Sequence, residues 1–133
     1  MTDIINRNDI ENLVTKFYES VNKDPLLAPI FEMPVDEWQK HLARAVNFWE
    51  NWLFQTGSYT GGMMWVHSET NQKHRLTTER FEHWLFIWMT TVDDLFVGEK
   101  ATFVKKKALE IAEIMNAKFS PTKEMISNKM NHG

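Results

Sequence analysis

Apolar residues recur along much of the chain at intervals of three and four, which is the period of helices with one buried face. From about Asn8 to Asn22 they form a single stripe: Ile10, Leu13, Val14, Phe17, Tyr18 and Val21. Asn8 and Glu11 predict a capping box at the start of this helix. The segment 23–34 contains three prolines, which permit only a turn of helix and a corner.

The same period predicts two further helices. One is expected from Asp36, which can cap it, to about Gln55. Its expected buried face comprises Trp38, His41, Leu42, Ala45, Phe48, Trp49 and Trp52. The other starts near Thr77 or Thr78, and Gly98 is placed to end it. Its stripe comprises Phe81, Trp84, Leu85, Trp88, Val92, Leu95 and Phe96.

A fourth helix is expected from about Lys100 to Phe119, where Pro121 stops it. Its stripe comprises Val104, Ala108, Ile111, Ala112, Met115 and Phe119. Glycines between 57 and 62 predict a loop, followed by a segment too short and polar for a long helix. Because no segment alternates with period two, we predict an all-α fold. We expect one domain over residues 1–133, with its core at about 8–119 and a loose polar tail at 121–133.

Composition narrows the possible functions. The chain has 133 residues, and its 13% aromatic content predicts either a very aromatic core or a site for a flat apolar ligand. It has no cysteine, which excludes disulfides, thiolate metal sites and iron–sulfur clusters. A net charge of −3 gives no indication of nucleic-acid binding, and no apolar run is long enough to suggest a membrane partner. With no signal segment recognisable at its polar start, we expect a cytoplasmic protein.

Four side chains on these segments could carry chemistry together. Taken singly, Tyr18 and Trp84 are ordinary core residues, His41 a half-buried histidine and His67 an exposed loop histidine. A flat aromatic cofactor bound among helices, however, needs an apolar slot, one strong axial donor and few polar groups on the opposite face. His67, on a short segment after the glycines, could approach a metal from one side, while the other three could meet on the opposite side. Clustered ligands for zinc or a di-iron site are absent from the sequence pattern.

In combination, four segments within about residues 9–118 resemble the third group of truncated haemoglobins. These segments are FYESVNKDPLLAPIF, EWQKHLARAVNFWENWL, YTGGMMWVH and RFEHWLFIWMTTVDDLFVGEKA. The resemblance implies a globin-like two-over-two helical sandwich that holds haem b. It further implies Tyr18 and His41 as the distal tyrosine and histidine, Phe31 packing on the haem, Trp84 as the tryptophan typical of this group, and His67 as the iron ligand.

The proximal ligand has an alternative. Relatives often carry a proline before the proximal histidine, where this chain has Gly62–Met64. His74, just before Arg75, is the fallback ligand. His67 is preferred because the step from Tyr59 through the glycines fits the family loop.

The resemblance also implies further contacts with the cofactor. These are expected from Phe17, Arg44, Ala45, Phe48, Met63, Arg75 and Phe81. Arg44 and Arg75 could pair with the two haem propionates, or could equally be ordinary solvated arginines. Ala45, one turn after His41, is small and should leave space above the iron.

The function implied is reversible binding of dioxygen and other diatomic gases, including nitric oxide and carbon monoxide. The alternative is an enzyme, either a nitric oxide dioxygenase or a peroxidase-like protein, with Tyr18, His41 and Trp84 acting on the ligand. An enzyme of this kind would need a separate reductase, because the sequence shows no flavin or nicotinamide domain. A third interpretation is a helical interaction module whose aromatic residues only form its core.

Overall fold

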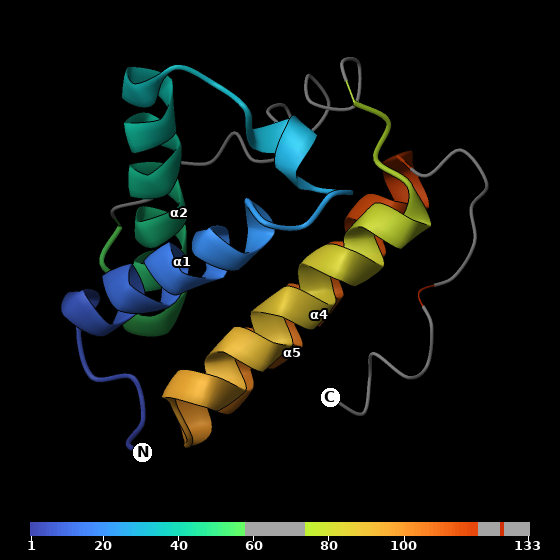
Figure 1. The fold of residues 1–133 in the computed structure, drawn as a ribbon. Helices are drawn as coiled ribbons and strands as arrows, with labels where there is room; N and C mark the ends of the chain where they lie inside the picture. The colour runs from blue at the N-terminus through green and yellow to red at the C-terminus, as the bar shows by residue number, and fades with distance from the viewer. Residues whose placement is uncertain (58–73, 120–125, 127–133) are drawn as a thin grey trace.

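The computed structural model describes residues 1–57, 74–119 and 126. Over these residues the chain forms helices and no strand, as Figure 1 shows. The elements are α1 (Arg7–Val21), the short 3-10 helix η1 (Ala28–Phe31), α2 (Val35–Phe54), α4 (Thr78–Leu95) and α5 (Glu99–Phe119). The all-α prediction and the order of the four long helices are therefore confirmed.

Side-chain caps explain where α1 and α4 begin. The side-chain oxygen of Asn6 accepts a hydrogen bond from the backbone N–H of Asp9 at 3.1 Å, so Asn6 is the N-cap of α1. The predicted cap, Asn8, is wrong, because Asn8 lies inside the helix. Several Asn and Asp residues lie in this turn, and each of them fits a capping pattern. Helix α4 starts where expected, and Thr77 caps it, accepting from the N–H of Arg80 at 3.2 Å.

The start of α2 differs from the prediction. Pro34, with φ −58°, occupies the N-cap position, and Asp36 lies in the first turn rather than before it. A carboxylate in the first turn still interacts favourably with the positive end of the helix dipole. The corner before α2 contains η1, which agrees with the single helical turn expected between the prolines.

Asp3, in the segment before α1, caps α5, although the two lie far apart in the sequence. The carboxylate of Asp3 accepts hydrogen bonds from the backbone N–H groups of Lys100 at 2.9 Å and Ala101 at 2.8 Å. The prediction that Gly98 ends α4 is wrong, because α4 ends at Leu95 and Gly98 immediately precedes α5. Gly98 has φ +145°, and a Cβ there would lie 2.5 Å from Cγ of Asp3, so glycine permits this close approach.

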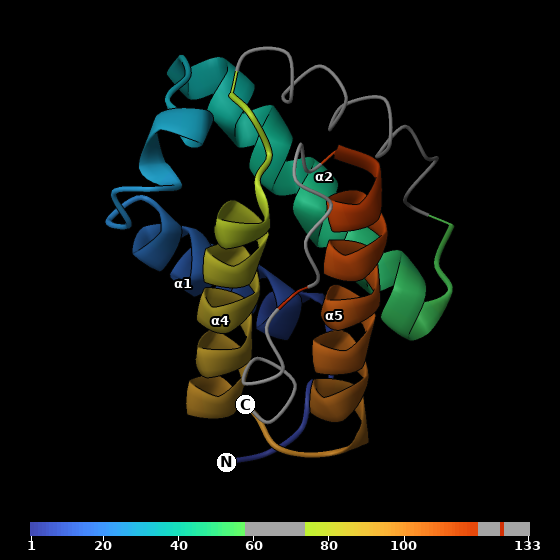
Figure 2. The ribbon, with the colours of Figure 1, turned by 90° about the vertical axis from the view of Figure 1, so that its right-hand side faces the viewer.

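The four long helices of the described residues form two layers of two. Figures 1 and 2 show α4 and α5 side by side, while α1 crosses α2 and packs against α4. Polar contacts also join α4 to α5: the indole N–H of Trp88 donates to the carbonyl of Val104 at 3.0 Å. Thr78 and Asn116, both buried, share a hydrogen bond of 2.8 Å. No helix among the described residues combines the length and apolarity needed to cross a bilayer.

The predicted stripes of α1 and α5 are fully confirmed, since every residue in them is buried. In α4 only two members of the stripe, Trp84 and Leu95, are half-buried rather than buried. The stripe of α2 differs, because only Trp49 of its seven predicted members is buried. Four side chains that sequence analysis connects with function lie on this less covered helix: His41, Arg44, Ala45 and Phe48.

Candidate functional site

Tyr18 lies at the centre of a group of aromatic rings. It is 8% exposed, and α1 directs it toward the corner and the first half of α2. Its ring centroid lies 5.4 Å from that of Phe31, 5.3 Å from that of Trp38 and 5.0 Å from that of His41, in each case edge to face. We call these four residues the Tyr18 cluster.

His41 belongs to the same cluster through three ring contacts. Trp38, one turn earlier on α2, stacks on the imidazole with centroids 5.5 Å apart and planes at 25°. Phe31, on η1, lies 5.5 Å from the imidazole on a tilted plane. Nε2 of His41 is buried, and Trp38 and Phe31 restrict the orientation of the ring.

Trp84 is connected to the Tyr18 cluster through Phe17. The ring of Phe17 contacts Tyr18 at 4.8 Å and Trp84 at 5.9 Å, so it lies between the two side chains. Trp84 is also parallel to Trp88, with centroids 6.5 Å apart and planes at 4°. The structure therefore brings Tyr18 and His41 into direct contact and holds Trp84 beyond Phe17.

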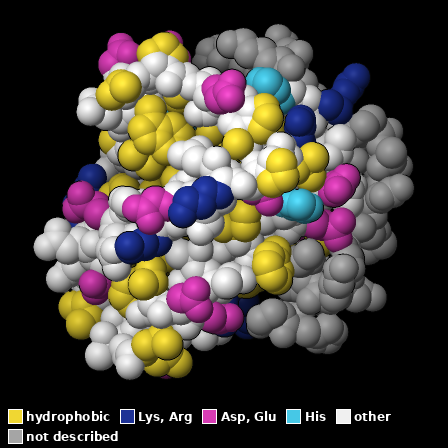
Figure 3. Space-filling model, in the orientation of Figure 1, with side chains coloured by type: hydrophobic (Ala, Val, Ile, Leu, Met, Phe, Trp, Pro, Cys, Tyr) yellow, Lys and Arg dark blue, Asp and Glu magenta, His cyan; other side chains and the backbone are white. Residues whose placement is uncertain are grey.

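The rest of the α2 stripe forms a half-buried apolar surface next to the cluster. Leu42, Ala45 and Phe48 follow His41 along this face, and each packs against the core without being enclosed by it. At the end of the helix, Trp52 is 43% exposed. Figure 3 shows hydrophobic side chains reaching the surface on the face of the molecule that it presents, interspersed with charged groups of both signs.

The remaining candidate residues differ in burial, and two of them lie outside the part of the chain that the structure describes. Arg44 and Arg75 are both exposed, and His74 is half-buried. Phe81 is 8% exposed and belongs to the hydrophobic core. Met63 and His67 lie outside the described residues, so the proposed iron ligand remains a prediction.

The electrostatics of the cluster favour hydrogen-bond donation. Burial raises the pKa of the Tyr18 phenol above its usual range. The hydroxyl is therefore protonated at neutral pH and can donate to a ligand that has lone pairs. Next to it, the imidazole of His41 can donate or accept through its ring nitrogens. Together they provide two polar groups within otherwise aromatic surroundings.

Known proteins are similar to this chain in both sequence and fold. No protein-family model matches it. It is 31% identical over 114 residues to the group 3 truncated haemoglobin ctb of Campylobacter jejuni, a match that covers 83% of this chain and 87% of that protein. The chain belongs to the group 3 truncated haemoglobins.

The fold of this truncated haemoglobin agrees with that assignment. The crystal structure of the group III truncated haemoglobin from Campylobacter jejuni superposes on it with a TM-score of 0.79. The two are 28% identical, and the match covers 92% of this chain and 98% of the other. The globin-like two-over-two architecture predicted from the sequence is confirmed.

Sequence reasoning missed the role of Trp38. It placed this residue on the buried face of α2 but did not include it among the site residues. The structure stacks its ring on His41. The spacing contains the signal, because residues three apart on a helix are neighbours on its surface. An aromatic residue one turn before a candidate functional histidine is thus itself a candidate for the site.

Proposed function

We propose that this truncated haemoglobin binds haem b and, at the haem iron, reversibly binds dioxygen and other diatomic ligands such as nitric oxide and carbon monoxide. The observation that carries the proposal is the buried, protonated phenol of Tyr18, whose ring lies 5.0 Å from the imidazole of His41. Membership of a haemoglobin family supports the cofactor, since the relative is a haemoglobin by name.

The described residues fit a haem. A macrocycle is flat and mostly apolar, and the half-buried face of α2 beyond His41 offers Leu42, Ala45 and Phe48 as apolar contacts. Tyr18 and His41 add two polar groups beside this face, as the distal side of a globin requires. Burial of apolar area contributes about 25 cal/mol per Å², so a cofactor that covered this face would also stabilise the fold.

The other haem contacts are proposals from the sequence. His67 is the proposed iron ligand and His74 the alternative. Arg44 and Arg75 are proposed to pair with the propionates, and both are exposed, as residues that hold a carboxylate at the edge of the protein need to be. Met63 is proposed as a further apolar contact.

The chain's own residues would control what the site does with a ligand. Haem iron supplies the atom to which a diatomic ligand binds. The Tyr18 hydroxyl donates a hydrogen bond to the ligand, and His41, oriented by Trp38, provides a second polar contact or limits access. The aromatic rings around these groups exclude water, which strengthens each hydrogen bond in the site.

Absorption spectroscopy of the purified protein tests the proposal. We expect haem bands in the oxidised and reduced forms, and a shifted spectrum when carbon monoxide is added to the reduced form. His67→Ala should abolish the spectrum of an axial imidazole, whereas His74→Ala should preserve it; the opposite result would make His74 the ligand. A colourless protein that takes up no haem on reconstitution would instead support the core-only interaction module.

A second candidate function uses the same site. The contact between Tyr18 and His41 supports it, because these two polar groups, together with Trp84, could act on one ligand and polarise an O–O bond. The chain would then be a nitric oxide dioxygenase or a peroxidase-like enzyme that works with a separate reductase. Nitrate formed per haem under a reducing system separates the two: many turnovers indicate an enzyme, and a single stoichiometric conversion indicates a ligand-binding protein.

A further inference from the structure

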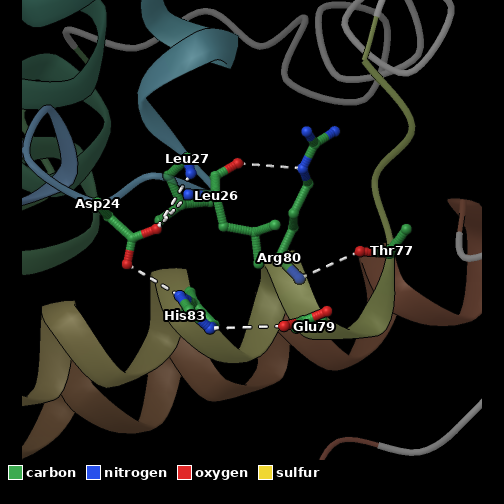
Figure 4. A network of polar contacts seen from close by, with 7 residues as sticks. All are labelled: Asp24, Leu26, Leu27, Thr77, Glu79, Arg80 and His83. Atoms are coloured by element: carbon green, nitrogen blue, oxygen red, sulfur yellow. Dashed lines mark hydrogen bonds and ion pairs between the residues drawn. The ribbon is translucent and has the colours of Figure 1, made fainter.

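A polar network joins the corner after α1 to the first turns of α4, as Figure 4 shows. The carboxylate of Asp24, in this corner, accepts a hydrogen bond from Nδ1 of His83 at 2.9 Å. Its other oxygen accepts from the backbone N–H groups of Leu26 at 2.8 Å and Leu27 at 3.1 Å. One aspartate therefore both shapes the corner and attaches it to α4.

These contacts change the acidity of Asp24. Its burial alone would raise the pKa of the carboxyl, but the hydrogen bonds from His83, Leu26 and Leu27 outweigh that effect and lower the pKa. The group is therefore ionised at neutral pH. A hydrogen bond to an ionised acceptor is stronger than one between neutral groups, and His83 supplies the donor of this one.

Arg80 adds a second attachment one turn earlier on α4. Its Nε donates to the carbonyl of Leu26 at 3.1 Å, and its Nη1 donates to the carbonyl of Arg75 at 2.8 Å. The guanidinium thus ties the corner to the segment that leads into α4. A planar group with several fixed donors can bridge two carbonyls in this way, which a lysine cannot do with the same geometry.

The network connects the elements that carry candidate site residues. Asp24 lies between Tyr18 and Phe31 in the chain, so the corner that it shapes connects two members of the cluster. On α4, His83 directly precedes Trp84, whose ring packs against Phe17. The network therefore links the elements that bear Tyr18 and Phe31 to the element that bears Trp84.

We propose that Asp24, His83 and Arg80 act as a clamp that positions the corner against α4 and so sets the geometry of Tyr18 and Phe31 relative to Trp84. The three are positioning residues: they adjust how strongly the site's donors bond to a diatomic ligand without touching that ligand. This role rests on the proposed function. Small displacements of a donor change its hydrogen bond steeply, because these bonds weaken quickly with distance and angle.

The test compares single variants on α4 with the wild-type protein. His83→Leu removes the donor to Asp24, while His83→Asn keeps an N–H donor at the same distance from the backbone as Nδ1. Glu79→Gln is the matched control, because Glu79 approaches the same imidazole at 4.0 Å from Nε2, whereas the bond to the corner is made by Nδ1. The side chain of His83 is 38% exposed, so these variants should fold.

The first measurement needs no haem. Amide hydrogen exchange at Leu26 and Leu27 should be about tenfold faster in His83→Leu than in the wild type, since loss of the bond from His83 loosens the turn. Exchange in His83→Asn should lie near the wild-type rate, and Glu79→Gln should leave it unchanged. Unchanged exchange in His83→Leu would show that the corner is held without His83 and would overturn the clamp.

The second measurement uses the reduced haem protein with carbon monoxide. The C–O stretching frequency reports hydrogen bonding to the ligand, and it should rise in His83→Leu and return toward the wild-type value in His83→Asn. Dioxygen should dissociate about three- to tenfold faster from His83→Leu, a smaller change than in Tyr18→Phe. Arg80→Lys should shift both quantities in the same direction.

The outcomes distinguish the clamp from the proposed function. If wild-type protein forms the carbon monoxide complex but His83→Leu matches it in frequency and dissociation rate, the clamp is overturned and haem binding stands. If His83→Asn behaves like His83→Leu, the hydrogen bond is not what positions the site, and the clamp is likewise overturned. If the wild type takes up no haem, the proposed function fails, and the role of the clamp fails with it.

Discussion

The α4–α5 pair and α2 carry stripes of the same period but bury them to different extents. All six predicted stripe residues of α5 are buried, whereas Trp49 is the one buried member of the seven predicted for α2. The compositions also differ: the α5 stripe is mainly aliphatic, and the α2 stripe is mainly aromatic and contains one histidine. Periodicity identifies a face, but it does not tell whether that face packs within the chain or binds something else.

The packing partners explain this difference. Helices α4 and α5 lie alongside one another and share a continuous core, whereas α2 packs mainly on α1, and its buried Trp49 stacks on Trp88 of α4 with ring centroids 4.7 Å apart. The residues of α2 on either side of that contact are consequently covered only in part. This half-covered face adjoins Tyr18 and His41, which is the arrangement expected of a surface that a haem would cover.

The largest expected effect comes from a matched pair of leucines. Leu85→Ala on α4 should lower the free energy of unfolding by about 2–5 kcal/mol, because Leu85 is 0% exposed and its removal leaves a cavity. Leu42→Ala on α2 should cost less than about 1.5 kcal/mol in the haem-free protein, because the side chain is only half-buried. Urea unfolding of both variants measures the difference. Equal losses would contradict the distinction between the two helices.

The next effect concerns the site beside α2. Tyr18→Phe removes one hydroxyl and preserves the ring contacts with Phe31, Trp38 and His41. Loss of a hydrogen bond to a charged acceptor costs about 1.5–3 kcal/mol, so dioxygen should dissociate about ten- to a hundredfold faster while haem stays bound. Stopped-flow dissociation kinetics measures the change. The control is Thr90→Val, an exposed hydroxyl on α4, which should leave the rate unaltered.

Much of the fold could be predicted from the sequence because its signals are local. A few neighbouring residues determine each of these signals: the stripes of α1 and α5, the start of α4 near Thr77, and the turn of helix between the prolines. The wrong cap at Asn8 shows the limit of such signals, since neighbouring polar residues satisfy the same pattern. Element boundaries are accordingly the least certain part of a sequence-based prediction.

The polar contacts that connect distant segments could not be predicted in this way. Asp24 and His83 are 59 residues apart, and Asp3 and Ala101 are 98 residues apart. No periodic pattern marks such a pair, because the chain brings its members together only when the helices pack. Within the candidate site, Tyr18, His41 and Trp84 were predicted to meet: Tyr18 and His41 are in contact, whereas Trp84 lies beyond Phe17. The stacking of Trp38 was missed, because its place in a stripe is equally typical of a core residue.

A smaller effect is expected at the cap of α5, on the well-packed side of the comparison. Asp3→Ala removes the acceptor for the N–H groups of Lys100 and Ala101, and loss of such a cap costs about 0.5–2 kcal/mol. Burial would raise the pKa of Asp3, but the hydrogen bonds from Lys100, Ala101 and Ile4 outweigh it and lower the pKa. The ionised form is therefore the one that stabilises the fold.

The sign of the pH dependence follows from that lowered pKa. The contribution of Asp3 should be complete above its ordinary value of 3.8 and should fall as the pH drops through its lower value in the folded protein. The difference in unfolding free energy between wild type and Asp3→Ala should therefore be constant near neutral pH and shrink below about pH 4. A difference that grew in acid would contradict this assignment.

The smallest expected effect concerns the contact between the end of α2 and α5. Nζ of Lys107 lies 3.7 Å from the ring centroid of Trp52, which is 43% exposed. A cation over an exposed aromatic ring contributes about 0.5–1 kcal/mol, so a double-mutant cycle of Lys107→Met with Trp52→Leu should give a coupling of that size. Lys106→Met, at an exposed neighbouring position, should show no coupling with Trp52→Leu. A coupling near zero for Lys107 would mean that this cation–π contact does not stabilise the packing of α2 on α5, and the contrast between the two helices would then be sharper.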